Sequence, residues 1–342
     1  MNWMGVRNRL SWYLTKLNYR RRIHVNGVTI RSPSIYGLTC RVTETWMIAL
    51  LSDLLKRREG AFLDVGVNLG QTLVKVKALD PRRVYVGFEP NPACVFYVRE
   101  LIKSNRFENC TLVPAGLFTQ DGILTLDLYS DSPTDIEASL VAGFRPTKKV
   151  HSRVFVPTFR FECIAEALKI GDVGIVKIDV EGAELDVVRS LLKVIQRHRP
   201  FVLLEVLPVY SSENVFRKDR QAQLEQIFAD AQYTLFQVKK TTAGDYAGLA
   251  PLETIGIHSD LDRCDHVMAP KERAAELLES GGASFGGARS ASRDAGQAID
   301  TAAEFSSRKG AEKGSGAEKG SERFVHKIVP PLFLFWKRVR TI

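Results

Sequence analysis

Short apolar runs alternate with amphipathic stretches along the chain from residue 61 onward. Five apolar runs are bounded by turn-forming residues and lie at 61–65, 83–88, 110–114, 174–179 and 201–206. Helical periodicity falls between or after them, over residues 70–79, 92–105, 183–197 and 220–231. Apolar runs of this kind are typical of strands that are buried on both faces of a parallel sheet. The pattern therefore predicts an α/β, Rossmann-like, doubly wound fold with helices on both faces of the sheet.

Further segments complete the predicted sheet. Residues 122–129 and 153–158 alternate apolar and polar positions, which predicts an inserted antiparallel pair of strands. Residues 232–238 and 266–269 are expected to close the sheet. The sheet is then expected to have seven strands, most of them parallel.

The two ends of the chain differ from this body. Residues 1–22 have helical spacing with basic residues interleaved, which is typical of a membrane-interface helix or of an ordinary helix packed on the domain. Residues 279–323 are rich in Gly, Ala, Ser, Lys and Glu and are predicted to be a flexible linker. Residues 324–342 form an apolar, basic tail. We expect a folded domain at 61–278 after a lead-in at 1–60. The lead-in is expected to hold a short β segment and a helix, at 23–30 and 43–57.

The net charge of +9 resides at the two ends of the chain. Residues 1–43 carry eight Lys or Arg and residues 324–342 carry four, and neither segment holds an acidic residue. Of the 48 basic residues, 36 remain in the body to face all 39 acidic ones. This slightly acidic body argues against nucleic acid as a partner. The basic, apolar ends at 1–22 and 324–342 are compatible with peripheral contact with a membrane. For the tail at 324–342, docking on a partner and an extension without function are the alternatives.

The cysteines and the lengths of the apolar runs indicate where in the cell the protein is located. The five cysteines show no close pairs and are odd in number, as expected of reduced thiols rather than a disulfide framework. We find no signal-peptide pattern, and no apolar run reaches the roughly 18 residues of a transmembrane helix. We therefore expect a cytoplasmic protein, in peripheral contact with the inner face of the membrane if its ends bind there.

A glycine-rich turn follows the first predicted strand, in the sequence Asp64-Val65-Gly66-Val67-Asn68-Leu69-Gly70. Glycines allow backbone N–H groups to approach a ligand closely at the start of a helix. Glu89 ends the next strand, and an acid at this position holds the hydroxyls of a nucleoside in α/β folds. By itself, the pattern fits NAD, FAD and S-adenosylmethionine equally well.

A second acidic motif follows the fourth strand, in the sequence Lys177-Ile178-Asp179-Val180-Glu181-Gly182-Ala183-Glu184. Ligands of open α/β sheets bind outside the carboxyl ends of the strands, so Asp64, Glu89 and Asp179 are expected at one edge. Carboxylates at the end of a core strand cost free energy unless they bind something, which favours a functional role for Asp179 and Glu181. Glu184 is expected to compensate the charge at the N-terminus of the next helix.

These motifs, with Glu89-Pro90-Asn91-Pro92 between them, resemble in order and spacing the FkbM-type family of class I S-adenosylmethionine-dependent methyltransferases. The likeness implies the class I methyltransferase fold and S-adenosylmethionine as cofactor. It also implies that residues 138–140 form a loop over the site. The residues that the resemblance assigns to the cofactor are Asp64, Gly66, Asn68, Gly70 and Glu89, with Ala115 and Gly116 near the adenine.

Methyl transfer to a hydroxyl needs in-line positioning and a base. Asp179 suits the base, or a divalent cation that it would hold together with Glu205, or a structural role. Glu181 is a second catalytic candidate. His151, in the inserted segment, is either a further candidate base or an exposed loop residue. No Asn-Pro-Pro-Tyr-like motif follows the fourth strand, which argues against methylation of a nucleobase or amide nitrogen.

The sequence thus predicts an S-adenosylmethionine-dependent O-methyltransferase. The expected acceptor is a hydroxyl of a sugar, a glycan or glycolipid, or a related small metabolite. The functional setting in which this family usually occurs implies this class of acceptor. One alternative is a non-catalytic binding or scaffold protein that keeps the methyltransferase fold. The other is an RNA methyltransferase, which the acidic body disfavours.

Overall fold

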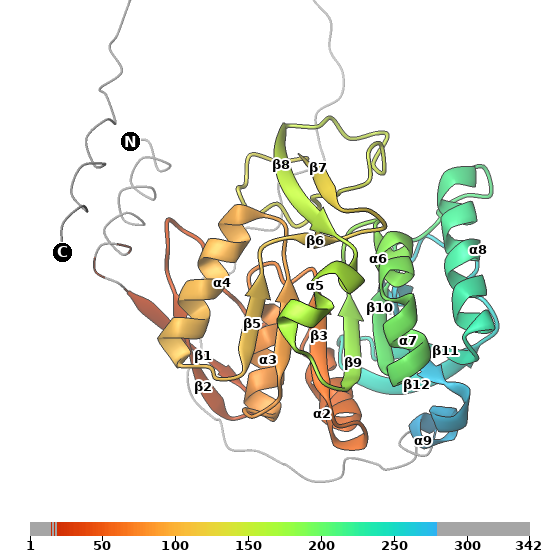
Figure 1. The fold of residues 1–342 in the computed structure, drawn as a ribbon, viewed down its shortest axis with the longest axis horizontal. Helices are drawn as coiled ribbons and strands as arrows, with labels where there is room; N and C mark the ends of the chain where they lie inside the picture. The colour runs from red at the N-terminus through yellow and green to blue at the C-terminus, as the bar shows by residue number, and fades with distance from the viewer. Residues whose placement is uncertain (1–14, 16, 18, 279–342) are drawn as a thin grey trace, which may run out of the picture. The chain divides into compact units, whose positions relative to one another are not determined.

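The computed structural model describes residues 15, 17 and 19–278, which belong to one compact unit (Figure 1). The predicted linker at 279–323, the predicted tail at 324–342 and most of the predicted helix at 1–22 lie outside the described residues. The domain boundaries given above therefore stay predictions. Within the described part of the chain, no helix is long and apolar enough to cross a membrane.

Eight strands form the central sheet, in the order β12-β11-β13-β10-β9-β3-β4-β5. Their bounds, in that order, are Tyr246–Leu252, Tyr233–Lys240, Asp265–Pro270, Phe201–Glu205, Val173–Ile178, Ala61–Val65, Tyr85–Phe88 and Cys110–Val113. The five strands from β10 to β5 are parallel, whereas β13 runs antiparallel to both neighbours and β12 runs antiparallel to β11. The predicted α/β, doubly wound, mostly parallel fold is confirmed. The edge strand β12 adds an eighth strand to the seven that were expected.

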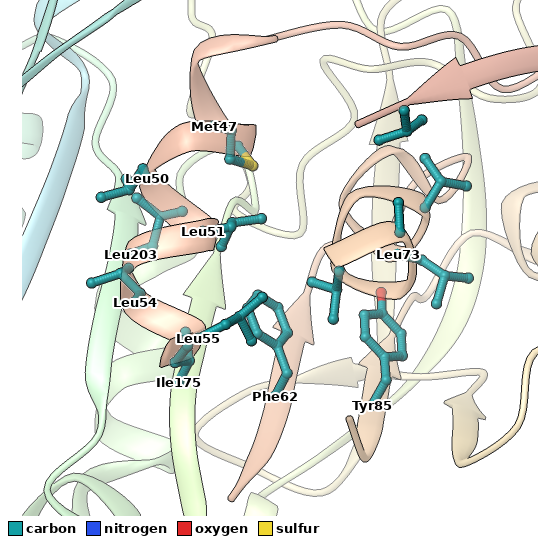
Figure 2. Packing of buried hydrophobic residues seen from close by; sticks show 14 of the residues in the cluster. Met47, Leu50, Leu51, Leu54, Leu55, Phe62, Leu73, Tyr85, Ile175 and Leu203 are labelled. Carbon is teal, nitrogen blue, oxygen red and sulfur yellow. The ribbon is translucent and has the colours of Figure 1, made fainter. Parts of the chain in front are cut away.

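Helices cover both faces of this sheet, because side chains alternate between the faces along each strand. Phe62 of β3 packs into an apolar cluster with Leu54 and Leu73, whereas Leu63 and Val65 belong to a second cluster on the opposite face (Figure 2). The helices of the first face are α2 (Trp46–Arg57), α3 (Gln71–Leu79) and α4 (Pro92–Asn105). Those of the second are α5 (Phe161–Leu168), α6 (Glu184–Ser190), α7 (Leu192–His198) and α8 (Val215–Asp230). Two 3₁₀ turns, Leu261–Arg263 and Lys271–Arg273, and α9 (Ala274–Leu278) complete the described chain.

A smaller sheet lies beside the carboxyl ends of the parallel strands (Figure 1). It consists of β6 (Gly116–Leu117), β8 (Ser152–Phe159) and β7 (Gly122–Leu128), in that order. β7 and β8 pair antiparallel, as predicted for the inserted segments. The chain between them, residues 129–151, is called the insertion loop below.

The β segment expected at 23–30 is confirmed, and it begins earlier than expected, so residues 20–22 are strand and not the end of the predicted helix at 1–22. Arg20–Val25 is strand β1, which pairs antiparallel with β2 (Val28–Pro33) across Asn26 and Gly27. Both turn residues have positive φ, of 48° and 77°, and Asn-Gly is the strongest short-range hairpin signal. Ile23 and Val25 are buried on one side of the hairpin, and pairing with β2 extends the strand back to residue 20.

Two helices also differ from the sequence prediction. The helix expected at 183–197 is divided at Leu191 into α6 and α7, and Leu191 is fully buried there. The helix expected from residue 220 begins at Val215, because the Asn214 side chain accepts a hydrogen bond from the Arg217 backbone N–H at 3.2 Å. An Asn N-cap of this kind satisfies one of the free N–H groups at the start of a helix.

Candidate functional site

A cavity of about 240 Å³ opens at the carboxyl ends of β3, β4, β9 and β10. That volume is far larger than a metal ion or one water molecule needs, so the cavity suits an organic ligand. Its wall includes the glycine turn after β3, residues 88–91 after β4, residues 179–181 after β9, and Glu205 at the end of β10. The insertion loop contributes Ala138 and Leu140, which confirms the expected position of residues 138–140 over the site.

The glycine turn is held against the end of β9. Gly66, Asn68 and Gly70 all have positive φ, of 91°, 50° and 85°. A Cβ added to Gly66 would lie 1.8 Å from the backbone oxygen of Asp179, so only glycine fits at that position. Gly66 and Asn68 line the cavity, whereas Gly70 contacts Leu101 of α4 behind it.

Glu89 joins the two turns that follow β3 and β4. Its Oε2 accepts the backbone N–H of Asn68 at 2.7 Å, and its Oε1 accepts the N–H of Asn91 at 2.8 Å. The side chain is buried at 6% exposure and lines the cavity. Burial raises the pKa of Glu89 to about 7, although the two N–H donors favour its ionised form. Each oxygen keeps a lone pair that can accept a hydrogen bond from a ligand.

Asp64 and Ala115 lie behind the wall of the cavity rather than in it. The Asp64 carboxyl is fully buried on the α2–α3 side of the sheet, where Oδ2 accepts a hydrogen bond from the Tyr85 hydroxyl. Its other oxygen, Oδ1, has no hydrogen-bond partner among the residues that the structure describes. Burial raises the pKa of Asp64 to about 6. Asp64 sits on the face opposite Leu63 and Val65 because side chains alternate along β3, whereas Gly116, next to Ala115, does line the cavity.

Asp179 and Glu205 form a carboxyl pair at the ends of the adjacent strands β9 and β10. Lys177, only 4% exposed, donates from Nζ to Asp179 Oδ2 at 2.9 Å. Burial opposes ionisation of Asp179, but Lys177 and a hydrogen bond with Glu205 bring its pKa below the usual range. The Asp179 charge and burial raise the pKa of Glu205 to about 11. The two carboxyls therefore do not both ionise readily, and Asp179, beside Lys177, is the more acidic of the two.

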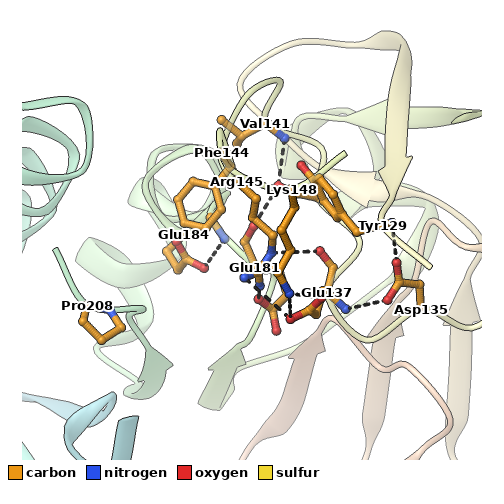
Figure 3. Close-up of polar contacts among 12 residues, drawn as sticks. Tyr129, Asp135, Glu137, Val141, Phe144, Arg145, Lys148, Glu181, Glu184 and Pro208 are labelled. Atoms are coloured by element: carbon orange, nitrogen blue, oxygen red, sulfur yellow. Dashed lines mark hydrogen bonds and ion pairs between the residues drawn. The ribbon is translucent and has the colours of Figure 1, made fainter. Parts of the chain in front are cut away.

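Glu181 also lines the cavity, where it pairs with Arg145 of the insertion loop (Figure 3). Burial, followed by the charge of Asp179, raises the pKa of Glu181 to about 8. Glu184 accepts the Gly182 N–H at 2.7 Å in the first turn of α6, in line with the role expected from the sequence.

His151 does not reach the cavity, so the structure does not support it as a candidate base. Its side chain is exposed, and its backbone N–H bonds to the Leu128 carbonyl at 2.7 Å, at the far end of the β7–β8 hairpin. Antiparallel pairing with β7 keeps it there. The exposed-loop alternative for His151 is confirmed.

Several buried polar residues near the cavity were missed from sequence. Lys75 of α3 is fully buried, and its Nζ lies 3.6 Å from Glu44, which lines the cavity. Lys177 lies inside an otherwise apolar strand. A lysine within such a strand was the available signal, because a buried ammonium needs a carboxylate partner.

A metal site at Asp179 and Glu205 stays a prediction. Among residues 15, 17 and 19–278, no group of three or more His, Cys, Asp or Glu is arranged to hold a metal ion. The two carboxyls instead hydrogen-bond to each other and lie beside Lys177.

The raised pKa values predict how stability depends on pH. Carboxyls whose pKa is higher in the folded than in the unfolded protein stabilise the fold below their unfolded pKa, and this stability is lost as pH rises through the folded value. In the folded protein, the pKa values of Glu89, Glu184 and Glu181 are about 7, 7 and 8. The stability that these carboxyls contribute is therefore lost between about pH 4.5 and pH 8. We expect urea unfolding of the ligand-free protein to show lower stability at pH 8 than at pH 5. The dependence should be shallower in Glu89→Gln, and a stability that rises over this interval would contradict the assignment.

Comparison with known proteins identifies a family for this chain. The model of the family described as "Methyltransferase FkbM domain" matches residues 64–235, which is half of the chain. No curated protein matches the sequence.

Similar solved structures include three methyltransferase-fold proteins of low sequence identity. The FkbM methyltransferase from Methylobacillus flagellatus KT is 13% identical, with a TM-score of 0.38 over 61% of this chain and 43% of that chain. Fibrillarin from Aeropyrum pernix, bound to S-adenosyl-L-methionine, is 15% identical, with a TM-score of 0.37 over 73% and 81%. SAH-bound PaMTH1 from Podospora anserina is 11% identical, with a TM-score of 0.37 over 79% and 96%. This chain thus spans less than half of the Methylobacillus chain. The family match covers both the glycine turn and the Asp179 motif, and the chain belongs to the FkbM methyltransferase family.

Proposed function

We propose that this methyltransferase uses S-adenosylmethionine to methylate a hydroxyl of a sugar, a glycan or glycolipid, or a related small metabolite. The observation that supports S-adenosylmethionine as the cofactor is the position of the Glu89 carboxylate. It accepts one backbone N–H from each of two turns. A carboxylate held in this way is a bidentate acceptor for the two hydroxyls of a ribose. The positive φ of Gly66 and Asn68 keeps the backbone beside it open to a ligand.

The charges of the cavity fit a cationic cofactor. Glu44, Asp179, Glu181 and Glu205 line the cavity, where Lys177 is the one basic residue among the described lining residues. S-adenosylmethionine supplies a methyl group on a positively charged sulfur when it is bound. Carboxyls with raised pKa values lose protons more easily beside a positive charge, so we expect cofactor binding to favour their ionised forms.

On the acceptor side, Asp179 is the group that we expect to take the proton of the acceptor hydroxyl. Lys177 favours the ionised form of Asp179, whereas the nearby charge of Asp179 disfavours ionisation of Glu205, so Asp179 is the stronger candidate for the base. A divalent cation shared by Asp179 and Glu205 is the alternative arrangement. It would displace the proton between them, and chelation by EDTA would then abolish transfer without weakening cofactor binding.

Isothermal titration with S-adenosylmethionine tests the cofactor assignment. We expect Glu89→Gln to weaken binding by roughly 10- to 100-fold, because an amide cannot replace the charged acceptor of two hydroxyls. Glu166→Gln is the matched control, since Glu166 is an exposed carboxylate of α5 that does not line the cavity. If the wild type binds no S-adenosylmethionine, the enzyme proposal fails and a non-catalytic scaffold is favoured.

The segment 324–342 and most of 1–22 lie outside the described residues, and the role of these two basic ends is a separate proposal. We propose that 1–22 and 324–342 bring the enzyme to the anionic inner face of the membrane, close to a glycolipid acceptor. The full-length protein should sediment with anionic liposomes, and removal of both segments should abolish this. Equal sedimentation of the truncated protein would refute the proposal.

A further inference from the structure

The insertion loop is bonded directly to the loop that follows β9, residues 179–183 (Figure 3). Arg145 forms an ion pair with the Glu181 carboxylate, and its Nε donates to the Glu137 carbonyl at 3.3 Å. Ser139 Oγ donates to the backbone carbonyl of Glu181 at 2.7 Å. Both the side chain and the backbone of Glu181 are therefore held by residues that lie about 40 positions earlier in the chain.

The backbone of this β9 loop has a conformation that needs such support. Glu181 has φ of 52° and Gly182 has φ of 108°, and a non-glycine residue at positive φ is uncommon and costs free energy. The Phe144 ring lies where a Cβ of residue 182 would be, within 2.5 Å of that position. The insertion loop thus packs against the one point of the β9 loop that only glycine can occupy.

Arg217 of α8 connects the insertion loop to a third segment. The side chain is buried at 9% exposure, and its guanidinium donates to the carbonyls of Phe144 at 3.1 Å and Pro208 at 2.9 Å. It also stacks on the rings of Phe144 and Tyr210, at 4.1 Å and 5.4 Å from their centroids. Pro208 and Tyr210 belong to the loop that begins directly after Glu205. Burial of this cation is compatible with the fold because carbonyl dipoles and ring faces surround it.

The two loops held by the arginines are the ones that begin at the carboxyl pair. Asp179 opens the β9 loop, and Glu205 immediately precedes the loop after β10. The insertion loop itself contributes Ile136 and Leu140 to the wall of the cavity, and Ile136 remains 67% exposed. The position of this wall and the alignment of the two carboxyls thus depend on shared contacts.

We propose that Arg145 and Arg217 are positioning residues, which fix the insertion loop and the two loops at Asp179 and Glu205 as one rigid wall on the acceptor side. This inference rests on the proposed function, because it assigns Glu181 to the support of Asp179 rather than to the chemistry. Within the described part of the chain, Glu89, which we assign to the cofactor, is held by the backbone of Asn68 and Asn91 and by neither arginine. Loss of an arginine is therefore expected to loosen the acceptor side and to leave cofactor binding largely intact.

Hydrogen–deuterium exchange measured by mass spectrometry tests this coupling in the full-length protein. We expect Arg145→Gln to raise exchange roughly tenfold both in residues 129–151 and in residues 179–183, because the ion pair and the Glu137 contact are lost together. Arg145→Lys keeps the charge and should restore part of the protection, and the exchanged pair Arg145→Glu with Glu181→Arg should do the same. Lys148→Gln is the matched control, since Lys148 is a cation of the same loop that pairs with Glu137 and not with Glu181.

The outcomes separate this inference from the proposed function. Increased exchange confined to residues 129–151, an equal effect of Lys148→Gln, or no rescue by Arg145→Lys would overturn the positioning role. If Arg145→Gln does not fold, Arg145→Lys and Arg217→Lys test the positioning role instead. Increased exchange in residues 179–183 is the expected result, and exchange equal to that of the wild type would contradict the role. Titration of Arg145→Gln, Arg145→Lys and Arg217→Lys with S-adenosylmethionine should give affinities within about threefold of wild type. Failure of the wild type to bind it would refute the proposed function while leaving the exchange result to stand.

Discussion

The Glu89 carboxylate accepts one backbone N–H from the turn after β3 and one from the turn after β4. These two hydrogen bonds fix the distance between the turns, and so they determine the shape of the cavity on its nucleoside side. Because Glu89 is buried, the negative charge that would bind a ligand destabilises the ligand-free fold. The raised pKa of Glu89 reflects this destabilisation. The close approach of Gly66 to the Asp179 backbone then links this side of the cavity to the carboxyl pair at β9 and β10.

The charges around the cavity follow a simple division. Lys177 lies in the core inside an apolar strand and favours the ionised form of Asp179, while the charge of Asp179 raises the pKa of Glu205. Two arginines from distant parts of the chain bond to loops on the same side, Arg145 through Glu181 and Arg217 through backbone carbonyls. The two arginines thus support the loops on the acceptor side, and the described charged residues that line the cavity are all acidic except Lys177.

Local sequence features predicted the parallel strands, the fold class and the meeting of Glu89 with the glycine turn, since these depend on apolar runs and on where strands end. Features that depend on long-range packing were not predictable in the same way. Asp64 lies behind the cavity wall because its side chain points from β3 to the other face of the sheet. There it accepts a hydrogen bond from Tyr85, which is 21 positions away in the chain. The position of His151 follows from strand pairing, and the edge strand β12 from its neighbour β11. The Asn26-Gly27 turn was a readable local signal for the N-terminal hairpin, whereas the contacts of Arg145 and Arg217 had none.

The central claim is that the glycine turn and Glu89 form one nucleoside site. A crystal structure of the protein grown with S-adenosylhomocysteine, the neutral product of the cofactor, tests this claim most directly. The account predicts that both ribose hydroxyls lie within hydrogen-bond distance of the Glu89 carboxylate, with the rest of the ligand along residues 66–68. A ligand bound elsewhere, or one whose ribose faces away from Glu89, would contradict it.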